Sequence, residues 1–207
     1  FALRRHALGV VRMLIERDLP LELNWLFHAA RLIDGQAIAM LADFIYERLA
    51  GSLREQGYSV LEVDAVVSLR PQRLGDIPKR LAAVRAFAAL PEAASLAAAN
   101  KRVGNILKKV DGPISSEVDA NLPQEPAEQE LRLALLRIVP KADAAFAAGD
   151  YTASLQTLAA LKAPVDAFFD NVMVNTEDAA LRNNRLALLS QLHAAMKRVA
   201  DLSRLAA

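Results

Sequence analysis

Apolar residues recur at intervals of three and four along almost the whole chain. Leu3, Ala7, Val10, Val11 and Leu14 share one helical face, and the same spacing returns within residues 41–53. No alternating run is long enough to predict a strand, and no repeat of fixed length is present. The pattern therefore predicts an all-α fold, a multi-helix bundle arranged as two helical subdomains.

Several short signals predict where the helices begin and end. Gly57 is placed to end the helix over 41–53, and Ser59 with Glu62 forms a capping box for the next. Gly149–Asp150 ends one helix and caps another, and Thr176 is the expected cap of the last helix. Four Gly and Pro residues within 111–126 predict a long loop there.

The composition restricts the class of protein. Hydrophobic residues make up 54 % of the 207 residues, which suits one large or two small packed domains rather than a disordered chain. The sequence has no cysteine, which excludes disulfides and thiolate metal sites and fits a reducing cytoplasm. No apolar run approaches the length of a membrane span, about 18 residues, so no membrane partner is expected. Because the chain starts on Phe1 in mid-pattern, we expect it to be a piece of a longer polypeptide.

Charge is nearly balanced in total but unevenly spread. The net charge is +1, yet residues 1–110 carry 16 Lys and Arg against 11 Asp and Glu. Residues 111–130 carry six acids and no base. A strongly basic nucleic-acid-binding protein would show a larger excess, but local stripes of positive charge could still bind RNA.

The sequence has none of the common catalytic or cofactor motifs. His6, His28 and His193 have no second ligand at metal-binding spacing, so they are interpreted as surface or boundary residues. Phosphate-binding glycine loops and the serine hydrolase elbow are missing as well. We therefore expect no catalytic residue, no metal site and no cofactor within this chain.

Two segments are the candidates for binding. The first, NKRVGNILKK over 100–109, puts four positive charges and no acid on a helix whose other face is apolar. Such a stripe can follow a phosphate backbone, although the pattern alone favours a solvated helix face near a C-terminus. Its candidate phosphate contacts are Lys101, Arg102, Asn105, Lys108 and Lys109.

The second segment spans Lys162 to Leu189. Helical spacing predicts that Val165, Phe168, Phe169, Val172 and Met173 form a buried face, with base stacking as the alternative. A polar cluster follows within 182–185, where Arg and Asn side chains could meet RNA bases or phosphates or simply form a surface salt-bridged turn. The candidates for contact with an RNA loop are Arg182, Asn183 and Arg185.

At these residues the chain resembles the C-terminal part of the β subunits of bacterial heterotetrameric glycyl-tRNA synthetases. The matching segments are FALRRHALGVVRMLIE (1–16), DFIYERLAGSLREQGYS (43–59), DAVVSLRPQRLGDIPKRLAAVRAF (64–87), ANKRVGNILKK (99–109) and PVDAFFDNVMVNTEDAALRNNRLALL (164–189). The last two also resemble the helical DALR anticodon-binding domain, although the literal Asp-Ala-Leu-Arg is replaced by Asp-Ala-Ala-Leu-Arg over 178–182.

The resemblance implies both an organisation and a function. Residues 1–90 would be a helical connecting region, and residues 91–207 a DALR-like anticodon-binding domain. The family joins glycine to its tRNA with ATP and Mg²⁺, with the aminoacylation site on the α subunit of an α2β2 assembly. This chain would then be a tRNA-binding module of glycine–tRNA ligase that contains no catalytic residue. The alternative is a structural or subunit-contacting module of the same enzyme without RNA contact.

Overall fold

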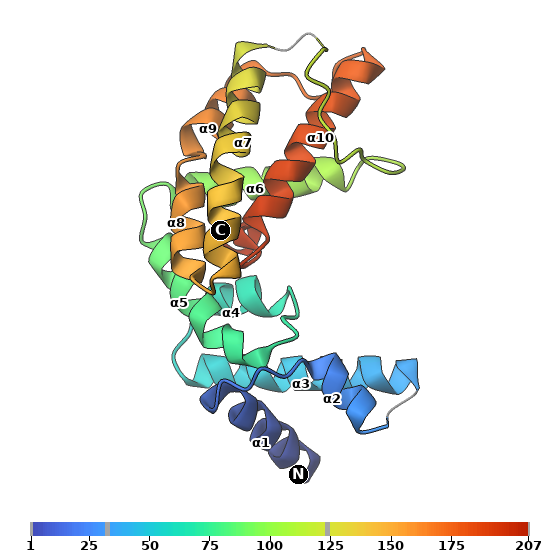
Figure 1. Cartoon of the computed structure of the whole chain (residues 1–207), viewed down its shortest axis with the longest axis vertical. Coiled ribbons are helices and arrows are strands. Elements are labelled where there is room, and N and C mark those ends of the chain that lie inside the picture. Colours follow the sequence, from blue (N-terminus) through green and yellow to red (C-terminus); the bar gives the residue numbers. More distant parts are fainter. Residues whose placement is uncertain (1, 32–33, 123–124, 207) are drawn as a thin grey trace. The chain divides into compact units, whose positions relative to one another are not determined.

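The computed structural model describes residues 2–31, 34–122 and 125–206, and its side chains from residue 5 onward. Every regular element in these ranges is a helix, and the one isolated β-bridge joins Glu22 and Arg73. The predicted all-α fold is thus confirmed (Figure 1). The chain divides into two compact units, Phe1–Ala82 and Ala83–Ala207. The functional boundary expected at residues 90 and 91 stays a prediction.

The first unit is built around one long helix, α3, against which α1 and α4 pack. Its core is aliphatic and includes Val11, Leu49 and Leu81, each almost wholly buried. The helix α5 begins in this unit and ends in the second. The elements are α1 (Ala2–Glu16), α2 (Leu23–Ala29), α3 (Gly35–Glu55), α4 (Val60–Val67), the 3-10 helix η1 (Leu74–Asp76) and α5 (Ile77–Ala88).

The turn between α3 and α4 follows the sequence signals closely. Gly57 has a φ of 91°, which a residue without a side chain adopts at little cost. The Ser59 hydroxyl accepts a hydrogen bond from the Glu62 amide at 3.2 Å, and the Ser59 amide donates to the Glu62 carboxylate at 2.7 Å. The predicted capping box is therefore confirmed, and it satisfies two amides that have no partner within the helix.

Two polar contacts join distant parts of the first unit. The Tyr46 hydroxyl is buried and donates to the carbonyl oxygen of Pro71 at 3.0 Å. Asp18 receives hydrogen bonds from Arg73 at 2.8 Å and Lys79 at 3.0 Å, and these two cations lower its pKa, Lys79 most. A side chain at Gly75 would place its Cβ 2.7 Å from the Asp18 carboxylate, so the Asp18 side chain and its two ion pairs would have to shift to admit it.

The second unit consists of five α-helices and one 3-10 helix within the described part of residues 83–207. Figure 1 shows α7 and α8 side by side, with α6 passing behind α7 and α10. The helix α6 packs on both α10 and η2. The elements are α6 (Ala93–Leu107), α7 (Pro126–Ala147), α8 (Tyr151–Ala159), α9 (Lys162–Asn171), α10 (Ala179–Met196) and η2 (Leu202–Leu205).

The ends of α8 and α10 test two of the predicted caps. Gly149 has a φ of 77°, and the Asp150 carboxylate accepts a hydrogen bond from the Ala153 amide at 2.9 Å, which confirms the predicted junction. The cap of α10 is Asp178, which accepts from the amides of the residues two and three positions later at 2.8 and 3.1 Å. The prediction of Thr176 as the cap was wrong, because a carboxylate two residues further on reaches these amides.

The buried face predicted for α9 is partly correct. Val165 and Phe168 are fully buried, and Val172 is buried, whereas Phe169 is only half-buried. The prediction was wrong for Met173, which is 71 % exposed. The reason is that α9 ends at Asn171, so helical spacing no longer decides where the following residues point.

The predicted long loop between α6 and α7 is held against α10 in its described part. The Asn184 amide accepts a hydrogen bond from the Asp119 backbone amide at 2.7 Å and donates to the Asp119 carbonyl at 3.1 Å. Two helical turns further on, Gln191 donates to the carbonyl of Ser116 at 2.8 Å. Three backbone groups of this segment, at Ser116 and Asp119, therefore bond to side chains of α10.

Length and apolar composition decide whether a helix of the described residues could span a membrane. In the described ranges no single helix is both long and apolar enough to cross a membrane. Residues Leu74–Ala88 and Ala93–Leu107 meet these criteria only together, with a bend of 111° between them.

Candidate nucleic-acid interface

One face of α6 carries most of the first set of predicted contact residues. A groove of about 550 Å³ runs along this face and is closed on one side by Asn175, which precedes α10. Its lining includes three cations, two amides and three aliphatic side chains, and no acid. We call it the α6 groove; its residues are Ala98, Lys101, Arg102, Asn105, Ile106, Lys109, Val110 and Asn175.

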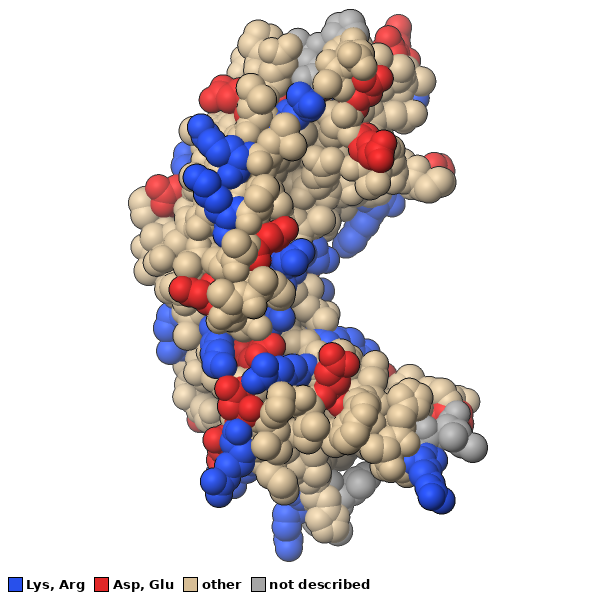
Figure 2. Space-filling model, in the orientation of Figure 1, with Lys and Arg blue, Asp and Glu red and all other residues tan. Residues whose placement is uncertain are grey.

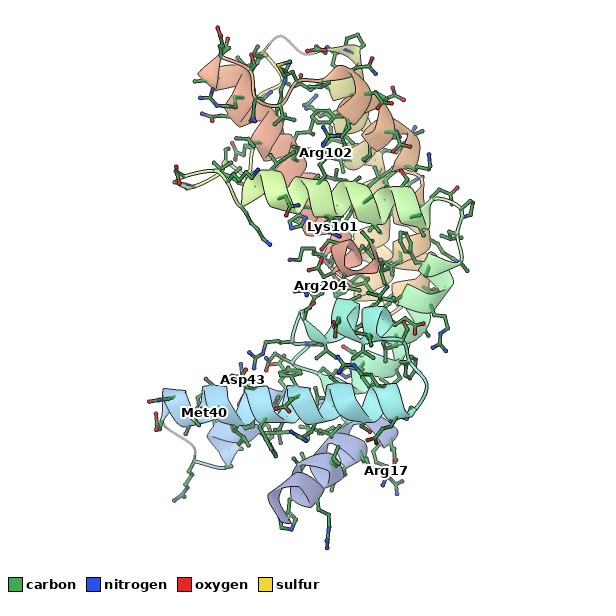
Figure 3. The ribbon with its side chains drawn as sticks, turned by 180° about the vertical axis from the view of Figure 1, so that it is seen from behind. Arg17, Met40, Asp43, Lys101, Arg102 and Arg204 are labelled. Atoms are coloured by element: carbon green, nitrogen blue, oxygen red, sulfur yellow. The ribbon has the colours of Figure 1, made fainter. Side chains whose placement is uncertain are left out.

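The side chains of α6 are presented in different directions. Figure 3 shows Arg102 on the side of α6 next to α9, and Lys101 on the side next to η2. The Arg102 guanidinium lies over the ring of Phe169, with its Cζ 4.2 Å from the ring centroid. The Lys101 Nζ lies 3.4 Å from the carbonyl oxygen of Ala206. Arg102 and Lys101 therefore border the groove from different edges of the helix.

One cation near this surface was not predicted from the sequence. Arg204 lies in η2 and is exposed, and Figure 3 shows it near Lys101. Its Nε is 3.8 Å from a carboxylate oxygen of Asp201, which leaves most of the guanidinium facing solvent. No local sequence signal marks Arg204, because only the packing of η2 on α6 brings it to this side.

Lys108 completes the first set but does not line the α6 groove. It is exposed and caps the C-terminus of α6, where positive charge is favoured by the helix dipole. Its position allows a phosphate contact beside the groove rather than within it.

The residues of the second set of predicted contacts, within 182–185, lie in different environments in the structure. Asn183 is exposed and lines a pocket of about 270 Å³ formed with residues 110–115 and Leu186. Val110 lines both this pocket and the α6 groove, so the two hollows are neighbours. Arg182 is half-buried and donates from Nη1 to the carbonyl of Thr176 at 2.8 Å. Of this set, Asn183 is the residue best placed to contact a ligand.

Arg185 has a different environment from the one expected. Its side chain is only 6 % exposed. Its Nε and Nη2 donate to Glu128 and Glu125, each at 3.1 Å, and its Nη1 donates to the carbonyl of Met173 at 2.8 Å. These contacts join α10 to the start of α7 and to the segment after α9. Arg185 thus stabilises the unit from inside, and we omit it from the proposed contact surface.

A half-buried histidine lies where α6 crosses α10. His193 Nδ1 is 2.6 Å from the side-chain oxygen of the fully buried Asn100. A Cβ at Gly104 would lie 3.3 Å from the His193 ring, so the small residue permits the close crossing. Burial lowers the pKa of His193, and the positive charges of Lys197 and Lys108 lower it further against the opposing effect of Asp201. The neutral ring therefore packs between the helices and fixes the position of α6.

Basic side chains also lie on the opposite face of the second unit. Figure 2 shows Lys and Arg gathered over α7, α8 and α9, with acids between them. Arg137 and Lys141, one helical turn apart in α7, are both exposed. This face is a second basic surface that could bind RNA, so an experiment must compare it with the α6 groove. Across the residues that the structure covers, no three His, Asp or Glu side chains are grouped as metal ligands.

The sequence of the chain matches two family models and several known proteins. The model of the glycyl-tRNA synthetase beta subunit matches residues 1–68, and that of the DALR anticodon binding domain matches residues 96–203. The glycine–tRNA ligase beta subunits of Dechloromonas aromatica (strain RCB) and Paracidovorax citrulli (strain AAC00-1) are each 67 % identical to the chain. That of Leptothrix cholodnii is 65 % identical.

These matches cover the whole of this chain but only about 30 % of each relative's length. The DALR match contains α7 to α10, α6 from residue 96 onward and η2 up to residue 203, hence all the predicted contact residues. The chain belongs to the family of DALR anticodon binding domains, and over its full length it is similar to a part of glycine–tRNA ligase beta subunits.

Proposed function

We propose that the chain is the tRNA-binding module of a glycine–tRNA ligase β subunit, and that the α6 groove contacts the anticodon arm. The observation that carries this proposal is the groove itself, which has three cations and no acid in its lining and lies within the DALR match. Cationic side chains held on a rigid helix bind phosphates and release condensed counterions, which supplies much of the affinity for RNA.

The proposal extends to the enzyme as a whole. Glycylation of glycine tRNA with ATP and Mg²⁺ would take place in the cytoplasm, on an α subunit that assembles with β. The names of the relatives support a β subunit of this ligase. The role of this chain would be to hold the tRNA, and its own residues would take no part in the chemical step.

A salt titration of RNA binding tests the proposal. The full 207-residue chain is mixed with glycine tRNA, and affinity is measured from low to physiological salt. Lys109→Ala should weaken binding and reduce the log–log salt slope by about 0.7 to 0.9, because one phosphate contact is lost. Lys109 is exposed, so the change should leave the fold intact.

Lys141→Ala is the matched control, since this exposed lysine lies on α7 and outside the groove. A slope that falls with Lys141→Ala and not with Lys109→Ala would transfer the interface to the α7–α9 face. No measurable affinity of the wild-type chain for glycine tRNA would instead support the structural alternative.

A further inference from the structure

The lining of the α6 groove is more varied than phosphate contact requires. Polar and cationic groups are sufficient to bind phosphates, yet beside its cations and the amides of Asn105 and Asn175 this groove also contains an aliphatic surface formed by Ala98, Ile106 and Val110. Its volume of about 550 Å³ lies within the range of small-ligand sites, about 300 to 1,000 Å³. The lining therefore fits a ligand with a charged part, a polar edge and an apolar surface.

The planar guanidinium group of Arg102 belongs to the lining of this groove and is held by an aromatic ring. Its guanidinium is stacked on Phe169, and Phe169 meets Phe168 edge to face, with ring centroids 5.5 Å apart and an angle of 82°. Phe168 is fully buried, so the stack is anchored in the core. Arg102 lines the groove, whereas Phe169 does not. A planar guanidinium held in this way can stack on a nucleobase.

The two amides supply groups that can recognise a base edge. Asn105 and Asn175 are both exposed, and neither side chain forms a hydrogen bond within the described ranges. Each amide offers one acceptor oxygen and two donor hydrogens. In RNA the Watson–Crick edge of a base is available only when the base is unpaired, and the deep major groove of an RNA duplex does not admit side chains. The polar part of the groove therefore suits single-stranded rather than duplex RNA.

From these contacts we infer that the α6 groove holds one unpaired nucleotide of an RNA loop. Its base stacks on the Arg102 guanidinium and meets the amides of Asn105 and Asn175, while Lys101 and Lys109 are close enough to bind its phosphates. This inference rests on the proposed function and adds the residues that hold and read one base, Arg102 by stacking and Asn105 and Asn175 by hydrogen bonds. Stacking tolerates every base, so sequence preference would come from the two amides.

Abasic substitution separates base contact from phosphate contact. The full chain is titrated with a glycine tRNA anticodon stem-loop, and with a series in which one loop nucleotide at a time lacks its base. One position should weaken binding by about 5- to 100-fold, the effect expected when one stacked base is lost. An equal and small effect at every position would overturn the inference.

Arg102→Lys identifies the partner of that base, because it keeps the positive charge and removes the planar group. The change should weaken binding of the intact stem-loop about 5-fold or more and leave binding of the abasic RNA at the critical position unaltered. Phe169→Leu should show the same dependence, because it removes the ring that holds the guanidinium. Thermal unfolding of each variant shows whether the fold is retained.

Lys109→Ala is the control for the charge. It should weaken binding of intact and abasic RNA by the same factor. If Arg102→Lys also weakens both equally, Arg102 contacts only phosphate, and the inference fails while the proposed function stands. If wild-type protein binds the stem-loop but no groove variant matters, the groove is not the interface and both fail.

Discussion

Replacing Arg185 tests whether this residue stabilises the second unit or binds RNA. The guanidinium is 6 % exposed and donates to two carboxylates and a backbone carbonyl. Of the two carboxylates, Glu128 is 1 % exposed, and its second oxygen has no hydrogen-bond partner among the described residues. Arg185→Ala would leave this charge buried and uncompensated, which costs about 3 to 5 kcal/mol.

Urea denaturation followed by circular dichroism measures this loss. With a slope of about 2 kcal/mol per molar urea, a loss of about 4 kcal/mol lowers the midpoint by about 2 M. Such a loss is a large part of the total stability of a domain, about 5 to 15 kcal/mol. Arg137→Ala, an exposed change on α7, is the control and should move the midpoint little.

A paired substitution separates the buried charge from the other contacts. Arg185→Leu with Glu128→Leu removes both ions and should recover most of the lost stability, because apolar residues of similar volume often replace a buried ion pair without cost. The reasoning is refuted if Arg185→Ala unfolds at the wild-type midpoint. Loss of tRNA binding at unchanged stability would restore Arg185 to the contact surface.

Three further changes follow from buried or closely packed groups. Burial raises the pKa of Tyr46 to about 12, above the unfolded value near 10, so its contribution to stability is complete below pH 10 and is lost as pH rises to about 12. Tyr46→Phe should remove this alkaline loss and cost about 1 to 2 kcal/mol at pH 7, because the Pro71 carbonyl loses its donor. Asn184→Ala should speed amide hydrogen exchange at Asp119 and its neighbours, since both hydrogen bonds to that residue are lost. Gly75→Ala should lower the free energy of unfolding by about 1 to 3 kcal/mol in urea, because the added Cβ has no room.

Helix boundaries were predictable wherever one local contact decides them. The capping box of Ser59 and Glu62 needs only residues three positions apart, and Gly57 needs only its own backbone. Thr176 failed because several polar residues in a row could cap α10, and the choice depends on where α9 ends. Sequence spacing identifies a helix more securely than it identifies its first residue.

The candidate site was predictable to the extent that exposure follows from helical spacing. Residues 101–107 lie on α6, whose other face is apolar, and Lys108 and Lys109 follow directly. The cations of this segment were therefore correctly expected to face outward. The central helix α10 is buried on several sides, and there the same argument gives the wrong direction for Arg185. One signal was present: residues 111–130 contain six acids and no base, so any ion pair of these acids must come from elsewhere in the chain, as it does for Glu125 and Glu128 with Arg185.

The polar residues of α10 and those of α6 have separate roles in the second unit. Asn184 and Arg185 hold the loop before α7 and the start of that helix, while His193 supports α6 through Asn100. The exposed cations of α6 form no ion pair with an acid in the lining of the groove, so their charge is available to a ligand. Changes at Asn184, Arg185 and His193 of α10 should alter RNA binding only as far as they alter stability, whereas changes in the α6 groove should alter binding at constant stability. A plot of binding against unfolding free energy for both sets of variants would separate the two helices, and a single common line would show that the groove has no role of its own.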